Sequence, residues 1–187
     1  MTLDELAVMY GNAKGSGWLN YMTEYEKYFA PLKDKAISIL ELGIGKGTSL
    51  KIWYEFFKNA KIYGIDISPD CKSFENERTQ VFIGGQQDLA FLEKMCNEIC
   101  EEFDIIIDDC GHVPRNQIIS LNFLQSKLKR GGIYAIEDIR RDSINFLVNH
   151  IENDLVKEME ILSVCSRFYT DAVDEKKEVS LLIGRKI

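Results

Sequence analysis

The chain has 187 residues, 45% of them hydrophobic, a length that suits one compact domain over residues 1–187 and excludes two large ones. With 23 Lys and Arg against 30 Asp and Glu, the formal net charge of −7 excludes a nucleic-acid polymer as partner, because that binding depends on clustered cations. No stretch approaches the ~20 apolar residues that cross a bilayer, and the N-terminus lacks the basic start of a secretory signal, so we expect a cytoplasmic protein with no membrane partner.

The first 30 residues predict two helices, Leu3 to Tyr10 and Asn20 to Phe29, joined by the glycine-rich segment Gly11 to Gly17. We expect these helices to form a lid on a core of residues 36–187. An aromatic stripe runs along the second helix: Tyr21, Tyr25, Tyr28 and Phe29. A stripe of this kind faces a core more often than a second copy of the chain, although a homo-oligomer through it stays open.

Beyond residue 35, short β-branched runs alternate with segments of helical periodicity, which is typical of a parallel sheet with crossover helices. The predicted strands are Ala36 to Leu42, Lys61 to Asp66, Gln80 to Gly84, Phe103 to Asp108 and Gly132 to Glu137. The predicted crossover helices are Thr48 to Asn59, Asp88 to Cys100 and Pro114 to Lys129. Because most of the strands are nearly all apolar, we expect them to be buried on both faces of the sheet.

The C-terminal part departs from this alternation. Lys157 to Cys165 and Glu178 to Lys186 are strand-like runs with no room for a crossover helix between them. We expect them to pair antiparallel at one edge of the sheet, and that exposed edge is a second place for a homo-oligomer to form. The prediction is an α/β fold, with a doubly wound, mostly parallel seven-stranded sheet and a C-terminal antiparallel hairpin.

The first predicted strand runs into a glycine loop, with Gly43, Gly45 and Gly47 directly ahead of a helix. Glycines let a backbone approach a ligand closely, and a helix N-terminus offers unpaired N–H donors. The loop fits neither the Walker pattern GxxxxGK[ST] nor the dinucleotide pattern GxGxxG. Asp66 ends the next strand, where an acid can bind ribose hydroxyls, so loop and acid together predict a nucleoside-like cofactor. The alternative is that Asp66 only caps the turn that follows it.

Acidic residues follow the fourth and fifth predicted strands. Asp108 and Asp109 end the fourth, and Glu137 and Asp138 end the fifth. The carboxyl ends of neighbouring parallel strands meet at one edge of a sheet, so we expect these acids to converge there. Crowded carboxylates repel one another unless a cation lies among them, which favours a hard divalent ion such as Mg²⁺. Asp108 is expected to face the cofactor instead, and the alternative for the set is that the acids cap the following helices.

His112 stands beside these acids, on the same loop as Asp109. An imidazole held there suits general-base chemistry near neutrality, and a purely structural role is the alternative. His150 is expected at the surface. The five cysteines, Cys71, Cys96, Cys100, Cys110 and Cys165, form no CxxC pair, so reduced thiols are expected. Cys96 and Cys100 lie four apart on a predicted helix, where packing is expected rather than metal binding.

Four stretches carry a resemblance over nearly the whole chain: ELGIGKGTSLKIW, IYGIDIS, FDIIIDDCGHVPRNQ and LKRGGIYAIEDI. In them the sequence resembles the class I S-adenosylmethionine-dependent methyltransferases, and in particular the small sugar O-methyltransferases of macrolide and aromatic-polyketide antibiotic pathways. The first two stretches mark only the superfamily, and the last two are more specific.

The resemblance implies a fold, an activity and a set of site residues. Mg²⁺ would be held by Asp109, Glu137 and Asp138, and His112 would act with Asp109 as base on a hydroxyl of a small-molecule acceptor such as a sugar. The residues that bind S-adenosylmethionine would be Glu41, Gly43, Gly45 and Gly47 around the methionine part, Asp66 at the ribose, Gln86 near the adenine, and Asp108.

The chain also departs from the usual family pattern, at Leu19, Gly85, Cys110, Gly111 and Asn116. These departures keep two alternatives open: a metal-independent methyltransferase, and a noncatalytic protein that binds S-adenosylmethionine. A nicotinamide-dependent oxidoreductase on a similar sheet is a further alternative, which the glycine spacing disfavours.

Overall fold

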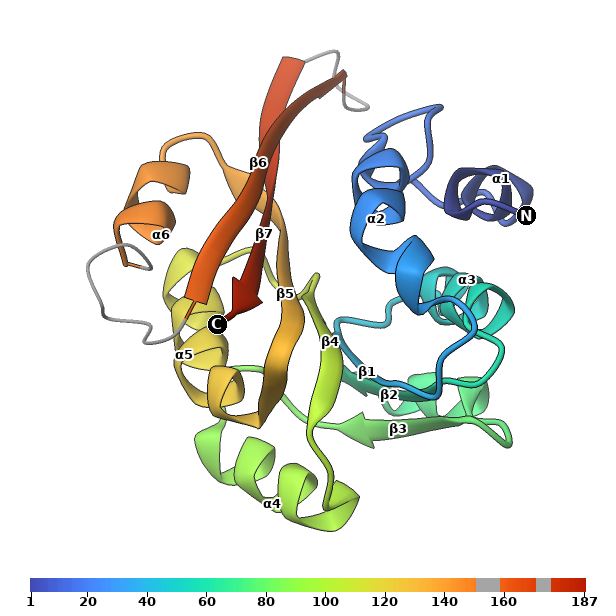
Figure 1. Ribbon diagram of the computed structural model, residues 1–187. Helices are drawn as coiled ribbons and strands as arrows, with labels where there is room; N and C mark the ends of the chain where they lie inside the picture. The colour runs from blue at the N-terminus through green and yellow to red at the C-terminus, as the bar shows by residue number, and fades with distance from the viewer. Residues whose placement is uncertain (151–158, 171–175) are drawn as a thin grey trace.

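The computed structural model describes residues 1–150, 159–170 and 176–187, and its centre is one seven-stranded sheet in the order β3-β2-β1-β4-β5-β7-β6 (Figure 1). The strands are β1 (Ser38–Leu42), β2 (Lys61–Asp66), β3 (Thr79–Ile83), β4 (Phe103–Asp108), β5 (Leu128–Arg140), β6 (Met159–Thr170) and β7 (Lys176–Lys186). The strands β1 to β5 pair parallel, whereas β7 pairs antiparallel with both β5 and β6. The predicted sheet and its terminal hairpin are therefore confirmed.

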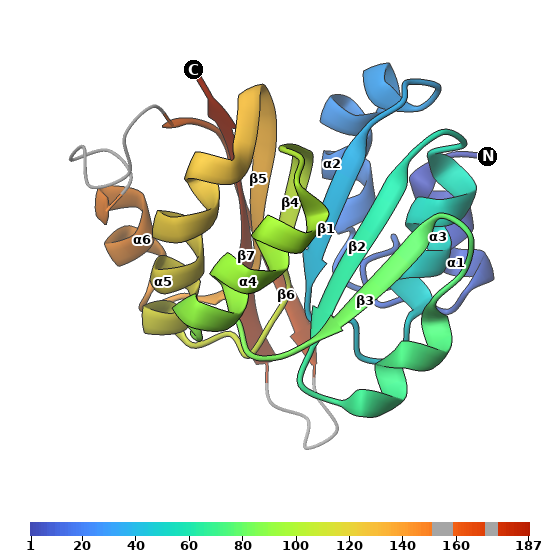
Figure 2. The same cartoon turned by 90° about the horizontal axis from the view of Figure 1, so that it is seen from below.

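Helices cover both faces of this sheet, as the view in Figure 2 shows: α1, α2 and α3 lie on one side, and α4, α5 and α6 on the other. Their bounds are α1 (Leu3–Met9), α2 (Tyr21–Phe29), α3 (Thr48–Phe56), α4 (Leu89–Ile99), α5 (Pro114–Leu124) and α6 (Ile144–His150). Short 3₁₀ helices span Ala30–Leu32, Pro69–Phe74 and Gln125–Lys127. No helix in the described ranges is long and apolar enough to span a membrane.

The central strands are buried on both faces, so their alternating side chains feed two separate hydrophobic cores. In β4, Ile105 and Ile107 pack with α1, α2 and α3, while Ile106 packs with α4 and α5. β1 follows the same period, with Ile39 on the first side and Leu40 on the second. The same alternation determines which of the two helical layers is faced by each acid at the end of a strand.

The aromatic stripe of α2 faces the core. Tyr21, Tyr25 and Phe29 are each fully buried, and the ring of Tyr25 stacks on Phe29 and meets Trp53 of α3 edge-on. The capping box that Thr2 and Glu5 form at the start of α1 secures the N-terminal end of this layer. Three of the four side chains of the stripe are therefore covered by the chain's own core, as expected.

Two differences from the predicted elements stand out, and part of the predicted hairpin is not described. β5 begins at Leu128 and runs to Arg140, so it takes up the end of the helix predicted to reach Lys129 and extends past Glu137. α6 was not predicted, because its seven residues, INFLVNH, carry too short a periodic pattern. In the hairpin, Lys157 lies outside the described residues, as does the side chain of Cys165.

Candidate functional site

The glycine loop joins the tip of β1 to α3 and folds against the tip of β4. Gly43 has φ +90°, and a Cβ built on it would lie 2.3 Å from the backbone oxygen of Asp109. The two strand tips are joined by the Asp109 amide, which donates to the carbonyl of Leu42 at 2.9 Å. β1 and β4 flank the point where the strand order reverses, which is where open α/β sheets bind ligands.

Asp66 at the end of β2 braces this loop. One of its carboxylate oxygens accepts from the amides of Ile44 at 3.0 Å and Gly45 at 2.9 Å, and the other accepts from Ser68 at 2.9 Å. Partial burial acts to raise the pKa of Asp66, but these hydrogen bonds outweigh burial and hold the pKa below its usual value. Asp66 therefore caps its own turn, as the alternative reading has it, and at the same time lines the pocket beside the loop.

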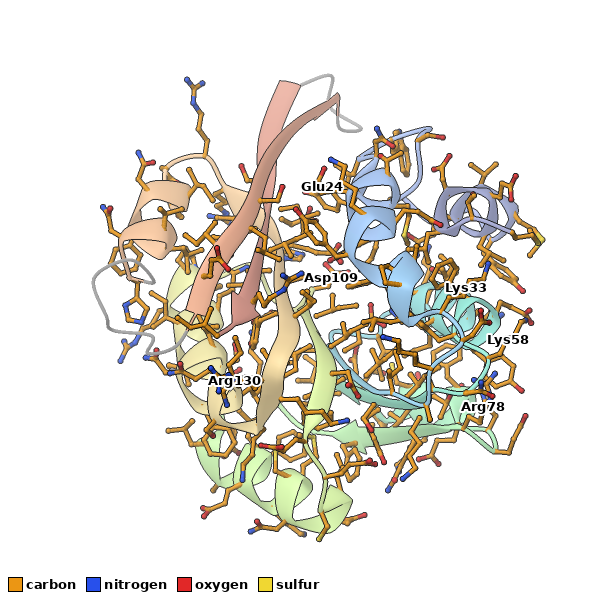
Figure 3. The ribbon with its side chains drawn as sticks, in the orientation of Figure 1. Glu24, Lys33, Lys58, Arg78, Asp109 and Arg130 are labelled. Carbon is orange, nitrogen blue, oxygen red and sulfur yellow. The ribbon has the colours of Figure 1, made fainter. Side chains whose placement is uncertain are left out.

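A pocket of about 670 Å³ opens at the carboxyl ends of the central strands. It brings together seven of the predicted site residues: Gly43, Gly45, Asp66, Asp109, His112, Glu137 and Asp138. Figure 3 shows Asp109 between α2 and the strands β4 and β5, and the segment between α1 and α2 forms a wall of the pocket. Trp18, 70% exposed, lies on that wall, and exposed Lys46 lies on the glycine loop.

The two adjacent acids of β5 reach this pocket because the strand bulges there. Ile136 pairs with Leu182 but Ile139 pairs with Ser180, so β5 carries one extra residue between these pairs. Asp138 has φ +50°, a left-handed conformation that is uncommon for residues other than glycine. Glu137 and Asp138 consequently face the same layer, where they accept from the hydroxyls of Tyr25 at 2.7 Å and Tyr21 at 2.9 Å.

A lysine from the segment between α1 and α2 lies among the converging acids. The Nζ atom of Lys14 is 2.7 Å from Glu137 Oε1, 2.9 Å from Asp109 Oδ2 and 3.4 Å from Glu41 Oε1. Its side chain is only 7% exposed. Burial opposes the charged form, but the neighbouring carboxylates raise the pKa of Lys14 well above its usual value. The predicted repulsion between the acids is thus relieved, in this structure, by a side chain of the chain itself.

His112 stands at the other end of the acid group, also in a left-handed conformation, with φ +47°. Its Nε2 atom is 3.8 Å from Asp138 Oδ2, and its Nδ1 atom is buried without a hydrogen-bond partner in the part of the chain that the structure describes. Asp109, His112 and Asp138 each offer a ligand atom, and these atoms lie within 4.8 Å of one another. Non-glycine residues held in strained backbone conformations cluster at functional sites, and here two of them are a potential base and a potential ligand.

Four predicted cofactor residues lie outside this pocket's lining. Gly47 begins α3 and lines a different cavity, and Glu41 is fully buried, where it accepts from Ser49 and Trp53 as well as Lys14. The expected orientation of Asp108 toward the cofactor stays a prediction, and the strand period turns Asp108 to the opposite face of the sheet from Ile107. There it accepts from Gln86 Nε2 at 2.8 Å and Ser120 Oγ at 2.6 Å, so Gln86 is buried as well.

The buried carboxyl of Asp108 is expected to make the unfolding free energy depend on pH. Burial raises its pKa from 3.8 to about 6, against hydrogen bonds from Ser120, Cys110 and Gln86. An acid with a raised pKa favours the folded state only while it is protonated, so this contribution is present below about pH 4 and is lost as the pH rises through about 6. Asp108→Asn keeps an oxygen for Gln86 and places a donor toward Ser120, without the charge.

Urea unfolding of the native chain and of Asp108→Asn at pH 4.5 and pH 7 measures this contribution. Between these two pH values the native chain is expected to lose about 2 kcal/mol of unfolding free energy relative to the variant. An unchanged difference between the two proteins at both pH values would show that the Asp108 carboxyl carries no such cost.

The sequence predicted no place in the site for Lys14, Tyr21 or Tyr25. Tyr21 and Tyr25 were expected to pack, and both do, but their hydroxyls also bind the acids of β5. The signal for Lys14 was its place in a glycine-rich segment next to a predicted lid. The thiols of Cys71, Cys96, Cys100 and Cys110 are free, and His150 is partly exposed beside Asn122, as expected. Cys96 is buried, but Cys100 is exposed at the C-cap of α4, so the packing predicted for Cys100 is wrong.

Comparison with known proteins supports the fold and places the chain in a family. The profile of a methyltransferase domain family matches residues 33–181. The 8-demethyl-8-α-L-rhamnosyl tetracenomycin-C 2′-O-methyltransferase of Streptomyces olivaceus is 32% identical over 142 residues, which is 72% of this chain and 37% of that protein. The L-olivosyl-oleandolide 3-O-methyltransferase of Streptomyces antibioticus is 32% identical over 143 residues, 73% of this chain and 36% of that protein. The chain thus spans about a third of the length of these curated relatives.

A solved structure agrees in fold. The MycE methyltransferase of the mycinamycin pathway, in a complex with Mg, SAH and mycinamycin VI, superposes with a TM-score of 0.79 at 24% identity, over 100% of this chain and 54% of that one. This confirms the sheet order and the terminal hairpin as a known arrangement. The profile match covers most of the chain, from just before β1 into β7, and so the chain belongs to the methyltransferase domain family.

Proposed function

We propose that the chain is an S-adenosylmethionine-dependent O-methyltransferase that acts on a hydroxyl of a small molecule, a sugar or a glycosylated natural product. One observation carries the proposal. A single pocket is lined by the glycine loop and Asp66 and also by Asp109, His112 and Asp138, which lie at the carboxyl ends of β4 and β5. The first group suits a nucleoside-containing donor, and the second suits a hydroxyl that must lose a proton. The curated relatives, named as O-methyltransferases of rhamnosyl and olivosyl compounds, support the acceptor class.

The glycine loop is the proposed donor subsite. Its backbone passes close to the tip of β4, and Gly47 is the N-cap of α3, so the first-turn amides of α3 have no side-chain cap where Thr48 and Ser49 line the pocket. The proposed donor contacts through Gly43, Gly45 and Asp66 come from this side. The acids across the pocket favour the positive charge of the donor's sulfonium.

The proposed acceptor subsite lies between His112 and the exposed ring of Trp18. In the reaction, the acceptor oxygen forms a bond to the methyl carbon, the sulfur–methyl bond breaks, and its electron pair stays on the sulfur of S-adenosylhomocysteine. His112 takes the hydroxyl proton, and Asp138 beside it favours the resulting imidazolium. Because both substrates must be in line, positioning supplies much of the rate.

The residues of this pocket also fit a divalent metal ion in part. Asp109, His112 and Asp138 offer converging ligand atoms, whereas Glu137 already accepts from Lys14 and Tyr25. We propose that Asp109 and Asp138 would hold Mg²⁺ through their oxygens that face His112, with Glu137 available only if its contacts with Lys14 and Tyr25 open. Lys14 would give up its contact with Asp109 Oδ2 where the ion needs that oxygen. A bound Mg²⁺ would make an acceptor hydroxyl more acidic and fix its orientation.

Methyl transfer to defined glycosides tests this function. The purified chain would be incubated with S-adenosylmethionine and rhamnosyl or olivosyl glycosides, with Mg²⁺ or with EDTA, and the products analysed by mass spectrometry. We expect a product with one additional methyl group and a lower rate with EDTA. Binding of S-adenosylhomocysteine without turnover on any glycoside would instead support the noncatalytic alternative, and binding of NADH in preference to S-adenosylhomocysteine would overturn the proposal.

Three further assignments belong to the same proposal. Residues 1–187 act as one domain, with residues 1–30 as a lid on the sheet. The free thiols fit a cytoplasmic location. The edge strand β6 is the place at which a homo-oligomer would extend the sheet.

A further inference from the structure

Lys14 belongs to no strand or helix, yet it is the most deeply buried cation of the pocket lining. The Gly11–Asn20 segment that carries it is fixed by its own contacts. The side chain of Asn12 donates to Thr48 Oγ1 at 2.8 Å, and the amide of Ser16 donates to Asp4 Oδ1 at 2.6 Å. The Lys14 carbonyl accepts from the amide of Met22 at 3.0 Å, which ties the residue to the start of α2.

The carboxylates around Lys14 come from three strands that are far apart in the sequence. Glu41 is the penultimate residue of β1, Asp109 follows β4, and Glu137 lies at the bulge of β5. Glu41 and Glu137 are at most 2% exposed at the side chain, so water cannot screen their repulsion well. A lone buried carboxylate is costly, and three together need a cation at hydrogen-bond distance. In the described chain only the Lys14 ammonium contacts all three.

We propose that Lys14 is a positioning residue of the site: its ammonium is the cation that lets Glu41, Asp109 and Glu137 converge, and the same contacts fasten the segment 11–20 to the strand tips as the wall of the pocket. The ammonium therefore competes with an added divalent cation for the oxygens of Asp109 and Glu137. The proposal concerns the geometry of the site that the proposed function uses. Its readouts are binding and stability without methyl transfer, so either proposal can fail while the other stands.

The variant Lys14→Met tests whether the ammonium is the cation that lets the three acids converge. The measurement is the change in melting temperature on addition of Mn²⁺, which serves as a divalent probe. Without the ammonium, the carboxylates need another cation, so Mn²⁺ is expected to raise the melting temperature of Lys14→Met by about 4 °C more than that of the native chain, which corresponds to about tenfold tighter binding. Lys14→Arg keeps the charge and should respond like the native chain. Lys51→Met makes the same charge change at an exposed position of α3 and should also respond like the native chain.

Hydrogen exchange tests the second part. The amides of residues 11–22 are expected to exchange at least about tenfold faster in Lys14→Met than in the native chain and in Lys51→Met, while the amides of β4 keep their protection. If Lys14→Met does not fold by itself, rescue of its folding by Mn²⁺ but not by NaCl of equal ionic strength would support the proposal. An equal Mn²⁺ response in Lys14→Met and the native chain, unchanged exchange of residues 11–22, or no rescue of an unfolded variant would overturn it.

Discussion

Gly43→Ala is expected to weaken the binding of S-adenosylhomocysteine at least about 100-fold, a loss of about 2.7 kcal/mol. The added Cβ would lie 2.3 Å from the backbone oxygen of Asp109 and 2.8 Å from its carbonyl carbon, so either the glycine loop or the tip of β4 must move. The left-handed φ of +90° adds a further cost of about 1–2 kcal/mol for an L-residue. Isothermal titration calorimetry measures the affinity, and thermal melting reports the accompanying loss of stability.

Gly17→Ala is the matched control for this variant. A Cβ at Gly17 meets no atom within 4 Å, and its φ lies outside the left-handed region, so both affinity and melting temperature should stay close to native. Native affinity in Gly43→Ala would mean that the approach of β1 to β4 does not shape the donor subsite.

His112→Asn is expected to lower kcat for methyl transfer by about 10²–10⁴-fold, while the affinity for S-adenosylhomocysteine changes less than about threefold. Asparagine is the replacement that strains the backbone least, because His112 has φ +47°, a conformation that asparagine adopts more readily than alanine does. The variant therefore removes the imidazole and leaves the loop in place. Initial rates at saturating donor and acceptor give kcat.

The other histidine supplies the control. His150 ends α6 and contacts Asn122 on the opposite face of the sheet, so His150→Asn should keep native kcat. If His112→Asn also keeps kcat within about threefold of native, another group takes the proton, and Asp109 would be the next residue to test.

The sheet was predictable because its strands carry a strong local signal. Lys61–Asp66 and Phe103–Asp108 were placed to the residue, since each is an apolar run between polar or glycine-containing stretches. The pairing of the last two strands followed from the short connection between them. The length of β5 was missed because Lys129, Arg130 and two glycines interrupt its apolar pattern, and Gly132 marked its start instead.

The site was only partly predictable, because the sequence shows where a strand ends but not which way each side chain turns. The convergence of Asp109, His112 and Asp138 followed from strand order alone. The placement of Asp108 and Gln86 on the far face depends on the phase of β4, which strand-end reasoning did not use. Lys14 is brought to the acids by the packing of α2 on the sheet, a long-range contact that no local pattern reports.

The side chains of β5 alternate between the two helical layers on both sides of the inserted residue Asp138. Ile133 and Ala135 pack with the N-terminal helices, and Tyr134, Ile136 and Ile139 pack with the other layer. Removal of Asp138 would leave Glu137 and Ile139 as successive residues of an ordinary strand, each still directed to its present layer. The alternation of β5 between the two cores is therefore the same with or without this residue, and what its removal would cost is the carboxylate that accepts from the buried Tyr21 hydroxyl.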